Sequence, residues 1–189
     1  MRLVSPPTIR PAAAVVMLLA SITGIEACTP GLDWRETRPA PATLGALRGL
    51  TLLMPCKPSV QQRTLSLAET PVQMTMCSCT AAGQTWGLAF ADVGDPGKLG
   101  PALQQLAAAA AANVNATEPQ PLALTVPGAT PHPSSQRVQW QGALPGGQAT
   151  WMQIAVFARG TWVIQATVLT PQAPGEAAQI FMESIRFGP

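Results

Sequence analysis

The sequence predicts an α+β fold, in which an antiparallel, twisted sheet of about six or seven strands has two helices packed on it. Two observations predict this fold. Many segments alternate apolar and polar residues between short turns that contain glycine or proline, as antiparallel strands do. Two other segments, near residues 100–114 and 174–187, repeat apolar residues at helical spacing. Because the order is strands, helix, strands, helix, we expect the helices to pack on the sheet.

The first half of the predicted domain is expected to form strands joined by tight turns. An apolar strand is expected between Gly49 and Cys56, where Pro55 ends it. Further strands are expected over 64–68, 72–77 and 85–91, with turns at 69–71 and 81–84. This half therefore supplies a hairpin and the strand that follows it.

The second half is expected to contain the longer helix and a three-strand meander. Gly100-Pro101 marks the start of the helix, and an alanine run gives it strong intrinsic propensity. Met152, Ile154 and Val156 alternate with other residues on the middle strand of the meander, which indicates that one sheet face is covered. The strands expected in this half are 122–126, 136–141, 149–158 and 161–169.

The last helix is expected over 174–187. Glu176 suits the amino end of a helix, where a negative charge is favourable, and Arg186 suits its last turn. The residues expected to form its buried stripe are Ile180, Phe181, Ser184 and Ile185.

The amino-terminal residues are typical of an export signal. Arg2 and Arg10 precede an apolar run over 12–22, which is too short and interrupted for a membrane-spanning helix. The run leads to Ile25-Glu26-Ala27-Cys28, which resembles a bacterial lipobox with Cys28 as the residue to be acylated. Lipid chains on that cysteine would anchor the protein in a bilayer. Glu26 departs from the pattern, so ordinary cleavage after Ala27, which leaves a soluble periplasmic protein, stays an alternative.

The sequence predicts a chain of three parts. Residues 1–27 are a signal peptide, residues 28–47 a flexible tether in which only Trp34 is expected to dock, and residues 48–189 a single α+β domain.

Thr29 follows the cysteine in place of the aspartate that retains such proteins at the inner membrane. For a Gram-negative source, this favours the outer membrane, facing the periplasm. Only 11% of the residues are charged and the formal net charge is +2, which argues against nucleic acid as a partner.

Three cysteines follow Cys28, and an oxidising periplasm favours a disulfide between two of them. Cys77 and Cys79 lie two residues apart on an expected strand and point to the same face, so they cannot easily bond to each other. Cys56 is the common partner of any bond. The residues alone leave open which of the other two it joins.

Three segments resemble a group of uncharacterised proteobacterial lipoproteins: Cys28-Thr29-Pro30 with Leu32–Glu36, Leu53–Pro58, and Phe181–Phe187. The order of elements also resembles the wider PsbP-like α/β/α sandwich. This resemblance covers nearly the whole mature chain, and it implies a fold and a location but no chemistry. It also implies a Cys56–Cys79 disulfide, because in that group a cysteine in a Pro-Cys-Lys-Pro turn accompanies one just before an Ala-x-Gly turn. Cys77 is an addition to the pattern and an alternative partner.

The sequence offers few residues for catalysis, so we expect no enzyme and no cofactor. His132, the only histidine, lies in a proline-bounded loop and is expected to be solvated. The carboxylates, Asp92, Asp95 and Glu183 among them, show no paired spacing and mostly lie at the ends of elements. No serine nucleophile elbow or phosphate-binding glycine loop is found.

The sulfur-containing residues suggest one alternative chemistry. Thiolate and thioether ligands suit Cu(I), but Met74 and Met76 alternate with Cys77 and Cys79 on the strand and therefore face the opposite way. We expect no metal site, and we read the methionines as core. The favoured function is a membrane-anchored, non-enzymatic accessory or binding module that meets an envelope protein or a cell-wall component. The alternative is a periplasmic thiol-redox or Cu(I)-handling protein that uses Cys56, Cys77 and Cys79.

Overall fold

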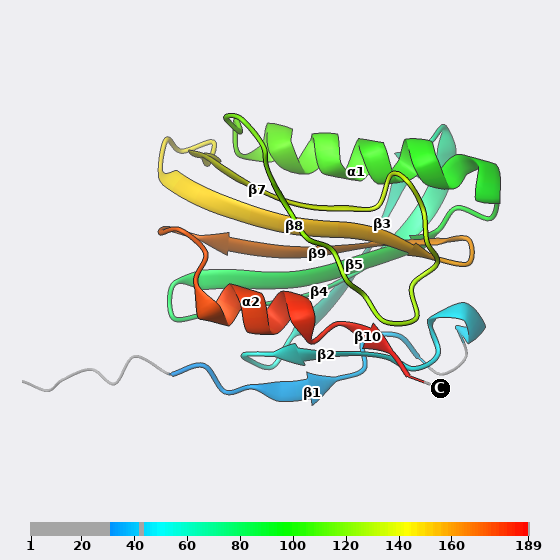
Figure 1. Ribbon diagram of the computed structural model, residues 1–189, viewed down its shortest axis with the longest axis horizontal. Coiled ribbons are helices and arrows are strands. Elements are labelled where there is room, and N and C mark those ends of the chain that lie inside the picture. The colour runs from blue at the N-terminus through cyan, green and yellow to red at the C-terminus, as the bar shows by residue number, and fades with distance from the viewer. Residues whose placement is uncertain (1–30, 42–43, 189) are drawn as a thin grey trace, which may run out of the picture.

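The computed structural model describes residues 31–41 and 44–188 and has an antiparallel α+β fold (Figure 1). The main sheet has seven strands in the order β3 (Ser59–Leu67), β4 (Thr70–Ala81), β5 (Gln84–Asp92), β9 (Trp162–Thr170), β8 (Ala149–Arg159), β7 (Gln136–Ala143) and β6 (Gln120–Leu122). A second sheet has the order β1 (Arg35–Thr37), β2 (Leu50–Met54) and β10 (Arg186–Phe187). The helices are α1 (Leu99–Asn113) and α2 (Glu176–Glu183). The predicted class, an antiparallel sheet with two helices, is confirmed, whereas the sequence does not predict the small sheet. The predicted signal peptide and Cys28 lie outside the described residues.

The main sheet is covered on both faces, so two cores form (Figure 1). On one face, α1 buries Leu99, Leu103 and Leu106 against strand residues such as Ile154 and Val163. The other face packs against α2 and the small sheet, around the largest buried side chains: Trp86, Phe90, Phe157 and Phe181. The expectation of one covered face was therefore incomplete, because every residue of β8 from Met152 to Ala158 is buried.

The first hairpin turn is shorter than predicted: it begins one residue earlier, at Ala68, and ends two residues earlier, at Glu69. Ala68 and Glu69 both have positive φ, at 46° and 63°, and join β3 directly to β4. Two such residues form the tight turn whose twist matches that of paired strands. Pro71 therefore lies at the beginning of β4, opposite Ser66, where a strand tolerates proline.

The carboxyl-terminal helix is shorter than predicted. It ends at Glu183, and the next residues form β10, in which Phe187 pairs with Leu50. Ser184 fixes this change, because its Oγ donates to the carbonyl of Phe181 at 2.7 Å and accepts from the amide of Leu53 at 2.9 Å. The backbone is thus redirected from the helix to β2. Two details of the prediction are wrong: Ile180 is exposed, and Arg186 belongs to a strand.

The stretch expected to be a flexible tether is partly folded. β1 pairs with β2, and the Trp34 ring packs edge-on against Trp86 at 5.7 Å between centroids. Leu47, also in this stretch, is only 1% exposed. The sequence does not reveal β1, because a three-residue strand is too short to produce a recognisable alternation.

The strand predicted over 122–126 is also different in the structure. Only Gln120–Leu122 pair with β7. The alternation continues beyond the sheet, because Leu124 and Val126 pack against the core that contains α2, whereas Ala123 and Thr125 are exposed. Residues 123–126 are therefore not part of the sheet, although one side of them is covered, and the chain then turns at Pro127-Gly128, where the carbonyl of Pro127 accepts from the amide of Phe187 in β10 at 2.9 Å.

Replacing Gly142 by alanine should destabilise the domain, because an added Cβ would lie 2.1 Å from the carbonyl oxygen of Val114 at the end of α1. We expect the free energy of unfolding to fall by about 1–3 kcal/mol, as is usual for overpacking. Urea denaturation followed by tryptophan fluorescence measures it. Gly146→Ala is the matched control, since nothing lies within 4 Å of its added Cβ. Equal stability of the two variants would contradict the close packing of β7 on α1.

Candidate functional site

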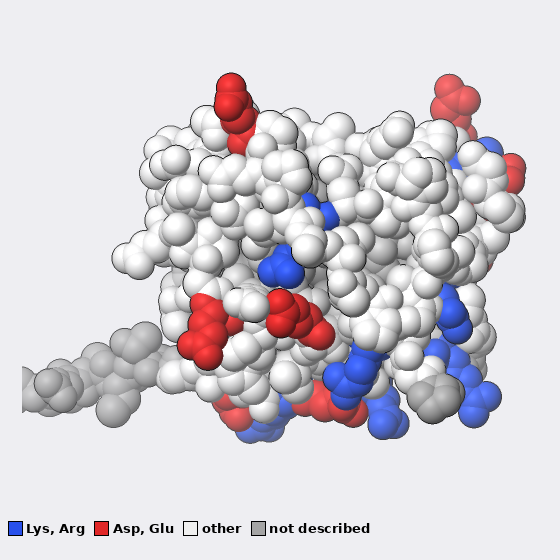
Figure 2. All heavy atoms as spheres, viewed as in Figure 1, with Lys and Arg blue, Asp and Glu red and all other residues white. Residues whose placement is uncertain are grey.

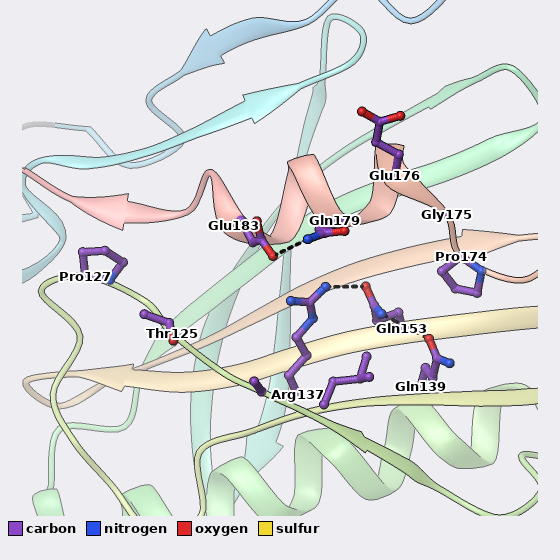
Figure 3. Close-up of a pocket in the computed structure, with 12 residues that line it drawn as sticks. Thr125, Pro127, Arg137, Gln139, Gln153, Pro174, Gly175, Glu176, Gln179 and Glu183 are labelled. Atoms are coloured by element: carbon purple, nitrogen blue, oxygen red, sulfur yellow. Dashed lines mark hydrogen bonds between the residues drawn. The ribbon is translucent and has the colours of Figure 1, made fainter.

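A large cavity lies between α2 and strands β7 and β8. Its volume is about 780 Å³, within the size range of small-molecule sites. Figure 3 shows residues 123–127 along one side of it and α2 along the other. Its lining is rich in polar side chains: Thr125, Arg137, Gln139, Gln153, Glu176, Gln179 and Glu183. The cavity is therefore the first candidate for a binding site.

Strand parity places the polar groups on the cavity side of the sheet. Val138 and Trp140 face α1 and belong to its core, so the alternate residues Arg137 and Gln139 face the other way. On β8, Gln153 lies directly opposite Gln139 and shares that face. α2 is only eight residues long, and this corner of the sheet is lined by polar side chains where an apolar core would otherwise continue.

Arg137 is the most unusual residue of the cavity. Its side chain extends from β7 toward α2 (Figure 3), and its Nη2 donates to Gln153 Oε1 at 3.3 Å. Its Nε is buried and has no hydrogen-bond partner among the described residues. Burial lowers the pKa of the guanidinium, and the charge of Glu183 opposes this shift, yet arginine stays protonated in proteins. A partly desolvated cation with unused donors therefore faces the cavity.

Hydrogen bonds among three glutamine side chains hold the floor of the cavity, formed by Gln139 and Gln153, in place. Gln153 is only 4% exposed, and its Nε2 donates to Gln139 Oε1 at 3.2 Å. Gln139 Nε2 in turn donates to Gln120 Oε1 at 2.8 Å. Burying an amide costs free energy unless it is hydrogen-bonded. These bonds therefore fix the Gln153 side chain in the position where it accepts from Arg137.

The helix wall of the cavity carries the opposite charge. Glu176, Gln179 and Glu183 recur at helical spacing on one side of α2, and Gln179 Nε2 donates to Glu183 Oε1 at 2.9 Å. In the part of the chain that the structure describes, no carboxylate oxygen lies within 4.0 Å of the Arg137 nitrogens. Figure 2 shows positive and negative groups close together in the middle of this face. The two charges face each other across the cavity without forming a salt bridge.

The predicted cysteine site has a structural role in the described domain. Cys56, just after β2, forms a disulfide with Cys79 of β4, with Cα atoms 6.0 Å apart. This is the pairing that the resemblance implied. A cross-link between residues 23 apart in sequence restricts the unfolded chain and contributes about 3 kcal/mol.

Cys77 keeps a free thiol that is buried, with 2% of the residue exposed. It belongs to the core that contains α2, and Cys79 packs against the same core. Met74 and Met76 instead lie with the core under α1, on the other face of the sheet. Burial raises the pKa of the Cys77 thiol, so less of it is the reactive thiolate at neutral pH.

The remaining candidates lie apart from the cavity. His132 is half-buried, contrary to the expectation of a solvated side chain, and its Nδ1 accepts from the amide of Ser134 at 3.1 Å. Asp92 and Asp95 accept from the amides of Gly94 and Gly97, which is local capping. Over residues 31–41 and 44–188, no three histidine, cysteine or acidic side chains are grouped as they would be around a metal ion. None of the helices described there is both long and apolar enough to cross a membrane.

Arg137 is a site residue that sequence reasoning missed. A signal was present, because Arg137 and Gln139 alternate with the apolar Val138 and Trp140, and Gln153 is a polar residue within a strongly apolar strand. That pattern predicts a polar patch on one face of a sheet. It does not predict whether the patch meets solvent or a cavity, which depends on where α2 ends.

Comparison with protein families and with curated proteins gives no relative for this chain. No protein-family model matches it, and a search of curated proteins finds no significant match.

The thiol of Cys77 should be unreactive in the folded protein. Burial shields the sulfur and raises its pKa, so iodoacetamide at pH 8 should leave Cys77 unmodified while the chain is native. Unfolding in guanidinium without a reductant should make it react fully. Peptide mass mapping separates Cys77 from Cys28. Rapid native alkylation of Cys77 would show that the thiol is accessible.

Proposed function

We propose that this protein is a lipid-anchored envelope lipoprotein whose domain is a non-enzymatic binding module, with the cavity beside α2 as its ligand site. The observation that carries the binding role is Arg137, a partly desolvated cation whose Nε has no described partner in the wall of a 780 Å³ cavity. A charge that is partly withdrawn from water and has a buried N–H without a hydrogen-bond partner is costly. A bound ligand that pairs with it accounts for its retention.

The proposed location, anchored in the outer membrane, rests on the sequence. Basic residues, an apolar run and Ile25-Glu26-Ala27-Cys28 support export and acylation, and Thr29 favours the outer membrane over the inner one. The partners proposed outside the cavity are the lipid bilayer, through Cys28, and an envelope protein or cell-wall component.

We also propose that the domain is a PsbP-like sandwich. Two segments of the resemblance support this: Pro55–Pro58, which follows β2, and Ser184–Arg186, which connects α2 to β10. The layers, with α1 on one face of the sheet and α2 on the other, are also those of an α/β/α sandwich.

No observation favours the thiol or copper alternative. Cu(I) binding would need the three cysteine sulfurs as thiolates, and thiol-redox chemistry would need a reactive, accessible thiol. Two of them form the disulfide, and the third is the buried Cys77. The binding module is therefore the one function proposed.

Cys28→Ala should abolish acylation and release the protein from the membrane fraction, because the anchor would have no attachment point. The check is fractionation of cells, with mass spectrometry of the amino-terminal peptide. Cys77→Ala is the control and should remain membrane-bound, since Cys77 lies in the core. If Cys28→Ala still fractionated with membranes, the proposed anchor would be wrong.

Ala123→Trp should block the cavity. Ala123 is exposed and lines the cavity, so a large ring can cover the opening without entering the core. Native mass spectrometry of the protein extracted from envelopes in mild detergent should show a small-molecule adduct on the wild type and none on this variant. Ala108→Trp, the same change on the exposed side of α1, should keep the adduct. An adduct that survives in Ala123→Trp, or none on the wild type, would count against the cavity as the site.

A further inference from the structure

The chemistry of the cavity walls narrows the class of ligand. This inference rests on the proposed function, because it concerns the same cavity. The sheet wall contributes one cation, Arg137, and the helix wall contributes two carboxylates, Glu176 and Glu183. The other polar side chains of the lining are amides and the hydroxyl of Thr125, which can both donate and accept. Figure 3 shows Arg137 directed toward the side of α2 that carries Glu183 and Gln179.

Three simple classes of ligand fit these walls poorly. A neutral ligand would leave Arg137 partly desolvated without a counter-charge. A simple anion would pair with Arg137 but would lie beside the carboxylates of α2, which repel it. A simple cation would suit those carboxylates but would approach the guanidinium. Each class satisfies one wall at the expense of the other.

A ligand that carries both charges satisfies both walls. Arginine presents its N–H groups in a planar fork that matches a carboxylate, and Arg137 uses only one of them, in the contact with Gln153. An ammonium group can donate to Glu183, whose Oε1 already accepts from Gln179 and is held in place by it. Gln139 and Gln153 line the floor between the walls and can bond to peptide groups.

We propose that the cavity binds a small zwitterion, a free amino acid or a short unblocked peptide, with its carboxylate on Arg137 and its ammonium group on the Glu183 side. The orientation is fixed by the two walls, so both ends of the ligand are recognised. The volume of 780 Å³ accommodates a peptide of a few residues.

The test uses the processed full chain in detergent micelles and isothermal titration calorimetry. The probes are alanine, alanyl-alanine and trialanine, and then the best of them with its amine acetylated or its carboxylate amidated. At least one unblocked probe should bind, and each block should weaken binding by at least about tenfold, the loss of one hydrogen-bonded charge. Binding that is indifferent to acetylation would overturn the zwitterion, and so would no binding of any probe.

Two variants test which side chain of the cavity binds the carboxylate of the ligand and which binds its ammonium group. Arg137→Gln should remove the preference for a free carboxylate, and Glu183→Gln should remove the preference for a free amine. Arg48→Gln and Glu118→Gln make the same changes at exposed positions that do not line the cavity, and should leave both preferences intact. Near-UV circular dichroism verifies that each variant is folded. Unchanged preferences in the cavity variants would overturn the assignment.

The outcome separates this inference from the proposed function. If the unblocked probes fail while the envelope protein still carries an adduct that Ala123→Trp removes, only the zwitterion is wrong. If the adduct is absent as well, the cavity is not the binding site.

Discussion

Strands β8 and β9 run through the middle of the main sheet, and their side chains need cover on both faces. One layer is a fifteen-residue helix, α1, which follows the strands for much of their length. The other is assembled from two distant parts of the chain: β1 and β2 near the start, and the segment from α2 to β10 at the end. The amino- and carboxyl-terminal segments must therefore meet before the second core closes. The contact between Ser184 Oγ and the amide of Leu53 is one of the bonds that join them.

The quality of the prediction follows the length of the elements. α1 and the meander β7–β9 have enough residues for their apolar periodicity to be read from the sequence, and their positions agree closely with those predicted. β1 and β10 have three and two residues, and they exist only because β2 pairs with both. No local pattern could reveal them, since their partners are remote in sequence. The end of α2 is set in the same way, by a tertiary bond of Ser184.

The candidate site was hidden for a related reason. Alternation on β7 shows that Arg137 and Gln139 face away from Val138, but both faces of a sheet are possible places for a core. Their surroundings are decided by α2, which packs Phe181 and Ala178 on the core and turns Glu183 toward the sheet corner. The disulfide differs, because its pairing came from a resemblance to other proteins.

The folded start of the chain limits how far an anchored domain could travel. The amide of Asp33 donates to the carbonyl of Pro55 at 2.9 Å, so the fixed part of the domain begins only five residues after Cys28. Extended chain spans at most about 3.6 Å per residue, so the distance from Cys28 to the fixed part of the domain is at most roughly 18 Å. A protein acylated at Cys28 would work within one domain diameter of the lipid headgroups. Its partners would then be molecules embedded in that membrane, or solutes and cell-wall components that come within the same distance of it.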